Sequence, residues 1–212
     1  MRRAGNRRKV VARPGGAGVS TELNILTEPG SGIAARAASF TLRHRVFRMI
    51  WSVTWTVLAA WTPAPLVAWR RLVLGAFGAN IHPTARVYGS ARIWYPPNLT
   101  MAAGAVLGPR SNCYSVARIT LGDGAIVSQG AHLCTGTHDI DDPGFQLIAA
   151  PIVIGRNAWV AAEAFVGPGI TIGEGAVLGA RGVAFSDLVP WGVYAGNPAR
   201  LLRTRQRPPH QG

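Results

Sequence analysis

The chain carries one histidine at a position suited to acid–base chemistry. His138 lies in the sequence TGTHD, where a regular six-residue pattern stops and an irregular stretch, residues 139–153, begins. An imidazole with an ordinary pKa of about 6.5 accepts a proton near neutral pH and can activate a weak nucleophile such as a hydroxyl group. A lone histidine is more often a surface or hydrogen-bonded residue, but its place at the base of this stretch makes His138 the candidate general base.

Two neighbours of His138 carry groups that could share its chemistry. Asp139 follows directly, and its carboxylate could orient the imidazole, bind a ligand hydroxyl or simply be solvated in the loop. Cys134 precedes His138 by four residues, which leaves open a thiolate nucleophile activated by the histidine. The stretch 139–153 itself is a candidate lid or recognition loop.

A six-residue repeat begins at Ile81 and supplies the elements that must position these groups. Each hexad starts with an aliphatic residue, and a small residue usually follows four places later. The leading residues are Ile81, Val87, Ile93, Met101, Leu107, Cys113, Leu121, Val127, Leu133, Ile154, Val160, Val166, Ile172, Leu178 and Ala184. A repeat this short predicts a solenoid, because its units bury their apolar residues only by stacking on one another.

The interruptions of the repeat indicate a three-sided column. Extra residues follow the third hexad (99–100), the sixth (119–120) and the ninth (139–153). Since every interruption comes after a multiple of three hexads, three hexads make one turn and all three insertions emerge at the same corner. The sequence therefore predicts a mainly β protein, a parallel β-helix of five coils about 24 Å tall at the usual spacing between strands of about 4.8 Å. In this register Cys113 points inward and Cys134 outward, so we expect both to be free thiols.

The segment before the repeat is apolar and rich in tryptophan. Arg48 and Arg70 enclose 21 uncharged residues, but two prolines leave only residues 49–61 as an uninterrupted helix candidate. Thirteen residues are too few to cross a hydrocarbon core of about 30 Å. Four tryptophans here are of the type that favours a membrane–water interface: Trp51, Trp55, Trp61 and Trp69. We expect an amphipathic element that lies on a membrane, and the alternative is a helix that packs against the repeats.

Composition and charge complete the domain organisation. We expect a disordered basic arm (1–20), an N-terminal helical and membrane-adherent segment (21–80), a β-helix catalytic domain (81–190) and a C-terminal cap with a basic tail (191–212). The net charge of +13 is concentrated at the two ends of the chain and indicates an anionic partner or a solvated tail. Aromatic residues are not interleaved with the basic runs, so we expect no nucleic acid partner. No apolar core follows the basic N-terminus as in a signal peptide, which predicts cytoplasmic residence, peripheral at the inner face of the membrane if the helical segment adheres to it.

Several stretches of the chain resemble a known family. Hexads such as LGDGAI, VSQGAH, IGRNAW and IGEGAV are similar to those of the hexapeptide acyltransferase superfamily. Within it, the stretch NCYSVARITLGDGAIVSQGAHLCTGTHDI and the later PWGVYAGNPARLL resemble the colanic acid and related exopolysaccharide O-acetyltransferases, over roughly residues 45–204. The resemblance implies a left-handed β-helix, a homotrimer with active sites between neighbouring subunits, and direct transfer of an acetyl group from acetyl-CoA to a sugar hydroxyl.

The resemblance also implies roles for particular residues. His138 matches the catalytic histidine, and Asn112, although differently spaced, resembles an acceptor-binding asparagine. Trp159 matches a tryptophan that lines the reaction cleft, and the small Ala162 and Ala180 match positions that meet the pantetheine arm. Two arginines match basic positions that face the nucleotide phosphates: Arg200 and Arg203. We expect no metal.

Two other functions remain open from the sequence. A metal-dependent hydratase of the same fold would need three histidines, and His132 and His138 lie on different sides of the column, so they could meet only across subunits. A non-catalytic trimeric scaffold would not bind coenzyme A. The membrane-adherent segment further predicts an acceptor that is a lipid-linked oligosaccharide rather than a free sugar.

Overall fold

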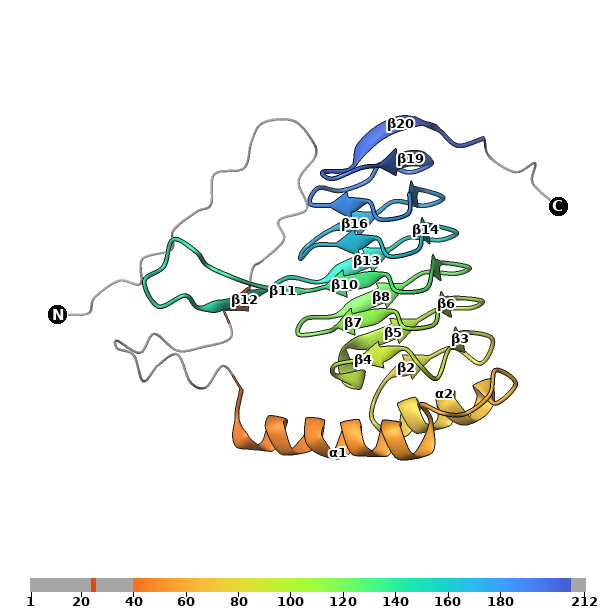
Figure 1. Ribbon diagram of the computed structural model, residues 1–212, viewed down its shortest axis with the longest axis vertical. Coiled ribbons are helices and arrows are strands. Elements are labelled where there is room, and N and C mark those ends of the chain that lie inside the picture. The colour runs from red at the N-terminus through yellow and green to blue at the C-terminus, as the bar shows by residue number, and fades with distance from the viewer. Residues whose placement is uncertain (1–23, 26–39, 207–212) are drawn as a thin grey trace.

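Short strands alternate with corners to build a three-sided column in the computed structural model, which describes residues 24–25 and 40–206 (Figure 1). The first face stacks β2 (Asn80–Ile81), β5 (Leu99–Met101), β8 (Ile119–Leu121), β13 (Ile152–Ile154) and β16 (Thr171–Ile172). The second stacks β3 (Arg86–Val87), β6 (Val106–Leu107), β9 (Ile126–Val127), β14 (Trp159–Val160), β17 (Val177–Leu178) and β19 (Gly192–Ala195). The third stacks β4 (Arg92–Ile93), β7 (Asn112–Tyr114), β10 (His132–Cys134), β15 (Phe165–Val166) and β18 (Val183–Ala184). Strands within a face are parallel, and the column is the expected left-handed parallel β-helix.

The leading residues of the hexads form the core, as the repeat predicts. Met101, Leu121, Ile154 and Ile172 stack in register on the first face, and each is almost fully buried. The other two faces stack their own leading residues in the same way. Burying one such aliphatic side chain contributes about 1.5–3 kcal/mol, so the ladders supply most of the stability of the column.

The two cysteines take the positions that the register predicts. Cys113 belongs to the inward ladder and is completely buried, while Cys134 faces outward and is half-buried. Both are free thiols. Burial raises the pKa of the Cys113 thiol to about 12 and also raises the pKa of Cys134.

All three insertions emerge at the corner between the third and first faces, which confirms the prediction. The two shorter ones lengthen β5 and β8, and a short 3₁₀ turn (Pro96–Asn98) precedes β5. The longest forms a hairpin of β11 (Gly136–His138) and β12 (Leu147–Ala149), which projects from the side of the column (Figure 1). The outer strand β1 (Asn24–Ile25) pairs with β12.

The column continues one partial coil beyond the five that the repeat predicts. Leu188 bridges to Ile172 on the first face, and β19 stacks on β17 with Tyr194 opposite Leu178. The antiparallel strand β20 (Arg200–Thr204) then closes the top of the second face (Figure 1). The basic arm at 1–20 lies outside the described residues, as does Arg207 of the basic tail.

Two helices close the base of the column. Helices α1 (Leu42–Leu58) and α2 (Val67–Ala76) lie across the first coil (Figure 1). Helix α1 begins seven residues before the predicted segment 49–61, because the side chain of Thr41 caps its first turn by accepting from the backbone N–H of His44. The helix ends at Leu58, before Trp61. Neither described helix combines the length and apolarity needed to cross a bilayer.

The helices dock through donors that satisfy exposed carbonyl groups. Alternate backbone N–H groups of a strand donate to carbonyls of the next coil, as Arg86 and Tyr88 do to Ala105 and Leu107. The first coil therefore presents carbonyls that have no coil beneath them to donate to them. Trp51 Nε1 donates to Ile93 O at 2.7 Å, and Trp55 Nε1 donates to the carbonyls of Gly89 and Ala91 at 3.1 Å each. These two tryptophans are buried, so assigning them to a membrane interface was wrong. Trp61 and Trp69 remain exposed.

Candidate active site

His138 stands at the end of β11 with its imidazole exposed and its orientation fixed. Its Nδ1 lies 2.8 Å from the carbonyl oxygen of Phe145, and its ring stacks on the Phe145 ring at 4.6 Å with an interplanar angle of 9°. Because a carbonyl oxygen only accepts, Nδ1 carries the proton in the neutral imidazole, and Nε2 keeps its lone pair. The geometry therefore presents a proton acceptor at the surface of the hairpin.

The loop between β11 and β12 is shaped by its own carboxylates. Asp139 Oδ1 accepts from the backbone N–H of Asp141 at 3.1 Å, and Asp142 Oδ1 accepts from that of Gly144 at 3.0 Å. The turn that results puts Phe145 at a φ of 48° and aims its carbonyl group at His138. The Asp139 carboxylate thus supports the turn, a role that the sequence analysis did not consider, and a backbone carbonyl rather than Asp139 orients the imidazole. Its expected role in binding a ligand hydroxyl stays a prediction.

The base of this hairpin is anchored on the corner of the column. The ring of Tyr114 lies so close to Gly136 that an added Cβ would meet its Cε1 atom at 3.0 Å. Leu147, opposite His138 in the hairpin, packs in a small cluster with Val116 and the Trp94 ring. Packing against the outer side chains of the third face therefore holds the hairpin that carries His138.

Asn112 lies on that face and is joined to a histidine that is not His138. Its Nδ2 is 3.2 Å from Nε2 of His132, the residue directly opposite on the next coil. Burial lowers the pKa of His132, whose ring also meets the edge of Phe165. Nδ2 donates to the imidazole, and Asn112 also lines the groove between α1 and the third face. The sequence analysis considered His132 only as a metal ligand, although its separation of 20 residues from Asn112 equals one coil of that part of the repeat.

The residues expected to meet coenzyme A lie on other parts of the column. Trp159 on the second face is 44% exposed, and its Nε1 donates to Ser128 Oγ at 2.9 Å. Ala162 and Ala180 occupy successive coils of the corner between the second and third faces, where Arg181 N donates to Ala162 O at 2.9 Å. The side chains of Arg200 and Arg203 are exposed on β20 at the top of the column.

One chain does not bring all these residues together. The hairpin with His138 projects from one side of the column, while β14 with Trp159 lies on the opposite side (Figure 1). Asn112, at the beginning of β7, shares the third face with the side chains that anchor the hairpin but makes no hydrogen bond to His138. A site that uses both His138 and Trp159 requires a second copy of the chain.

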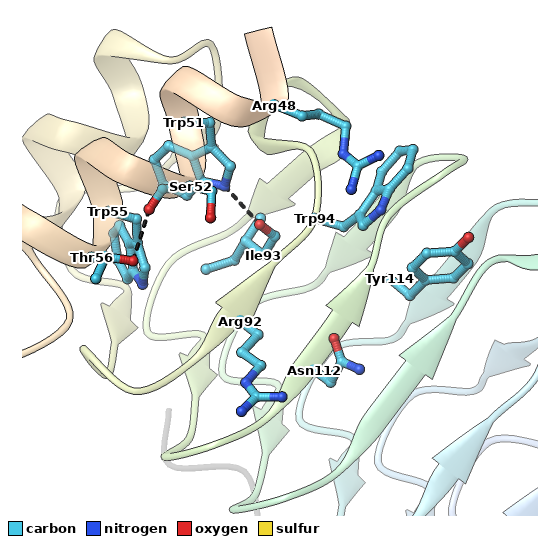
Figure 2. A pocket seen from close by; sticks show the side chains of 10 residues that line it. All are labelled: Arg48, Trp51, Ser52, Trp55, Thr56, Arg92, Ile93, Trp94, Asn112 and Tyr114. Carbon is cyan, nitrogen blue, oxygen red and sulfur yellow. Dashed lines mark hydrogen bonds between the residues drawn. The ribbon is translucent and has the colours of Figure 1, made fainter. Parts of the chain in front are cut away.

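A groove separates α1 from the third face (Figure 2). Its cavity volume is about 460 Å³, and its polar and aromatic lining includes Arg48, Ser52, Arg92, Trp94, Asn112 and Tyr114. In Figure 2 the guanidinium group of Arg48 covers the Trp94 ring, with Cζ 3.8 Å from the ring centroid. The sequence analysis found Asn112 of this group but not the arginines, because they come from different elements.

No metal centre is formed within the part of the chain that the structure describes. Nowhere in residues 24–25 and 40–206 do three or more His, Cys, Asp or Glu side chains gather closely enough to hold an ion. The outward thiol of Cys134 donates to the carbonyl of Gly136 at 3.2 Å rather than to His138.

Comparisons with known proteins place this architecture among acetyltransferases. No family model matches the chain. The putative colanic acid biosynthesis acetyltransferase WcaF of Escherichia coli is 42% identical over 155 residues, which cover 73% of this chain and 85% of that protein. Galactoside O-acetyltransferase of E. coli is 28% identical over 147 residues, covering 68% of this chain and 60% of that protein.

Solved structures share the fold. A maltose O-acetyltransferase from Clostridium difficile superposes with a TM-score of 0.69 at 23% identity, covering 79% of this chain and 90% of that one. A hexapeptide-repeat acetyltransferase from Vibrio cholerae, solved with acetyl coenzyme A, gives a TM-score of 0.70 at 20% identity, covering 79% and 91%.

Proposed function

The chain belongs to the family of hexapeptide-repeat acetyltransferases that includes the colanic acid acetyltransferase WcaF, and on that premise we propose that it moves an acetyl group from acetyl-CoA to a sugar hydroxyl in exopolysaccharide synthesis. The observation that carries this proposal is the oriented imidazole of His138, with Nδ1 bonded to Phe145 O and Nε2 free. WcaF is named for colanic acid biosynthesis, and that name supports a polysaccharide acceptor.

The proposed reaction is a direct transfer. Nε2 of His138 takes the proton of the acceptor hydroxyl as its oxygen attacks the thioester carbonyl. The tetrahedral intermediate then expels the coenzyme A thiolate, which recovers the proton from the imidazolium. Phe145 O, which accepts from Nδ1–H, stabilises the imidazolium between these steps. No covalent enzyme intermediate is involved, and Cys134 has no part in the chemistry.

The proposed donor site uses Trp159, Ala162, Ala180, Arg200 and Arg203. The half-exposed indole, held by Ser128, offers an apolar wall to the thioester end of the donor. Small side chains at Ala162 and Ala180 let an extended pantetheine arm approach the backbone of two successive coils. Exposed guanidinium groups on β20 suit the phosphates of the nucleotide, because charge-assisted hydrogen bonds to phosphate are strong.

The function is tested by assaying the purified protein with acetyl-CoA and a panel of saccharides. We expect release of free coenzyme A that depends on the saccharide, and a fall on the order of 10²–10⁴ in rate for His138→Ala. His82→Ala, at an exposed position on the first coil, is the matched control and should retain activity. Equal turnover by His138→Ala and the parent protein would refute the assignment.

We further propose that the active form is a homotrimer whose sites combine His138 of one subunit with Trp159 of the next. Their positions on opposite sides of the column support this arrangement. Mixing subunits of His138→Ala and Trp159→Ala during refolding should then restore activity, since about a quarter of the sites in a random trimer receive both intact residues. Mixtures that stay as inactive as each variant alone would show that the two residues act within one subunit.

We also propose that the outer face of α1 rests on a lipid surface. Its exposed apolar residues form one stripe opposite the buried Trp51 and Trp55: Leu42, Val46, Met49, Ile50, Val53 and Val57. Residues 40–122 contain nine arginines and no carboxylate, which favours anionic lipid. The protein should float with anionic but not neutral vesicles, and Val53→Glu should weaken flotation, whereas Val153→Glu on the first face should not. Equal flotation of all three proteins, or none with the parent, would contradict this contact.

A further inference from the structure

The groove between α1 and the third face contains two arginines and no acidic side chain. Arg48 comes from α1, and Arg92 begins the third face in the first coil, so the two cations enter the groove from opposite walls (Figure 2). Neither forms an ion pair with any residue that the structure describes. Positive charge in this groove is therefore not neutralised by the described chain.

Arg48 is only partly satisfied where it lies. Its guanidinium stacks on Trp94 at 3.8 Å, but its Nε is buried and has no hydrogen-bond acceptor. Burial lowers the pKa of Arg48, because removing a cation from water disfavours its charged form. A bound anion would supply the missing counter-charge and hydrogen-bond acceptors for the guanidinium group.

The surroundings reinforce this positive potential. All seven carboxylates of residues 40–206 lie at Asp123 or later in the chain, while nine arginines lie before it. Among the described residues, the base of the column thus carries cations without compensating anions. A cleft lined by one sign of charge concentrates ligands of the opposite sign.

The groove also offers contacts suited to a saccharide and leads to the proposed catalytic group. Asn112 and Ser52 provide polar atoms, and Trp94 and Tyr114 form an aromatic wall. The ring of Tyr114 also contacts Gly136 at the base of the hairpin, two residues before His138. A ligand held here therefore shares the Tyr114 ring with the base of the hairpin that carries His138.

We propose that this groove binds the acceptor saccharide through an oxyanion on it, a phosphate or a carboxylate held between Arg48 and Arg92. This inference rests on the proposed function and narrows its substrate class to anionic saccharides. Each arginine contributes charge-assisted hydrogen bonds, and Asn112 contacts the ring that carries the anion.

Binding is measured by calorimetry on the full chain without acetyl-CoA, using four probes. Glucose 1-phosphate and glucuronate carry the two kinds of oxyanion, while methyl glucoside is neutral and inorganic phosphate has no sugar. We expect at least one anionic saccharide to bind 10-fold or more tightly than methyl glucoside, and more tightly than phosphate. The stronger of the two identifies the oxyanion.

Single variants test where the anion binds. Arg92→Gln and Arg48→Gln should each weaken the favoured probe by about 10–100-fold, the usual range for a charge-assisted hydrogen bond. Arg86→Gln is the matched control, because Arg86 holds the same hexad position on the second face and lies outside the groove. Equal affinity for neutral and anionic probes, or equal weakening by Arg86→Gln and Arg92→Gln, would overturn the inference.

Acetylation assays separate this inference from the function on which it rests. Suppose that the protein acetylates neutral and anionic saccharides with the same kcat/KM, and that Arg92→Gln changes neither of these two values. The proposed anion site is then wrong, and the proposed acetyltransferase function is retained. If the anionic probes bind through both arginines but no saccharide is ever acetylated, the proposed function is wrong and the site stands.

Discussion

Arg70 Nε donates a 2.7 Å hydrogen bond to the carbonyl oxygen of Val87, and so joins the second helix to the first coil of the column. The same buried guanidinium donates four more hydrogen bonds to the connection between the helices, at Thr62, Pro63 and Ala64. A charged side chain is stable in this position because Nε, Nη1 and Nη2 all donate to carbonyl or hydroxyl oxygens.

Replacing Arg70 should therefore destabilise the protein strongly. Arg70→Met fills much of the volume but leaves several acceptors unpaired, and we expect the free energy of unfolding to fall by about 3 kcal/mol or more. Arg71→Met, which removes a single 3.2 Å contact to Ala85 O from a half-buried side chain, should cost less than about 1 kcal/mol. Urea denaturation of the two variants checks this difference, and equal losses would contradict the capping role of Arg70.

The stacked ring of Phe145 should affect catalysis through His138. Phe145→Ala keeps the carbonyl that accepts from Nδ1 but removes the ring that lies parallel to the imidazole. We expect kcat to fall by about 10-fold, a smaller loss than that from deleting the base. Phe165→Ala, a ring on the third face, should leave kcat closer to the parent value, and steady-state kinetics would compare them. A Phe145→Ala enzyme with unchanged kcat would mean that the hydrogen bond alone orients the imidazole.

The thiols of Cys113 and Cys134 should take no part in catalysis and should react poorly with thiol reagents in the folded protein. Because burial raises the pKa of Cys113 to about 12, this thiol should react with a thiol reagent only when the protein unfolds. Cys134, half-buried and with its pKa also raised by burial, should react slowly in the native protein. Cys134→Ala should keep full acetyltransferase activity, and stoichiometric acetylation of Cys134 would instead favour a covalent intermediate.

Two histidines should make stability depend on pH. Burial lowers the pKa of His132 and of His44, so the folded protein takes up these protons at lower pH than the unfolded chain. The free energy of unfolding should therefore be unaffected by these groups above about pH 6.5 and should fall as pH drops below it. His132→Gln should flatten this dependence, whereas His82→Gln, an exposed substitution, should not. Denaturation at pH 7.5 and 5.5 measures both slopes.

The column could be predicted closely because its repeat has one simple cause. Each leading aliphatic residue points inward, so spacing alone assigned the register in which Leu107 stacks on Val87 and Val127. The sixth coil escaped prediction because its spacing changes. Ile172 follows Ile154 by 18 residues, but Leu188 follows Ile172 by only 16, since the corner after Ala184 is shorter.

The site was less predictable because it depends on contacts between separate elements. Tryptophan suits both a membrane interface and a buried hydrogen bond, so composition alone misassigned Trp51 and Trp55. Their spacing of four residues on one side of α1, with the apolar stripe on the other, distinguishes them from Trp61. The Phe145 carbonyl that orients His138 results from a loop turn, and no side-chain pattern specifies it.

Because α1 docks beneath the first coil, the His138 imidazole lies at a fixed height above α1 along the axis of the column. His138 leaves the column from the third coil, two coil spacings, or about 10 Å, above the first coil on which the helices dock. If the acceptor is anchored beneath α1, the distance along the column from α1 to His138 selects which hydroxyl of the glycan reaches the imidazole. Adding one 20-residue coil below the hairpin would move that choice by about 4.8 Å.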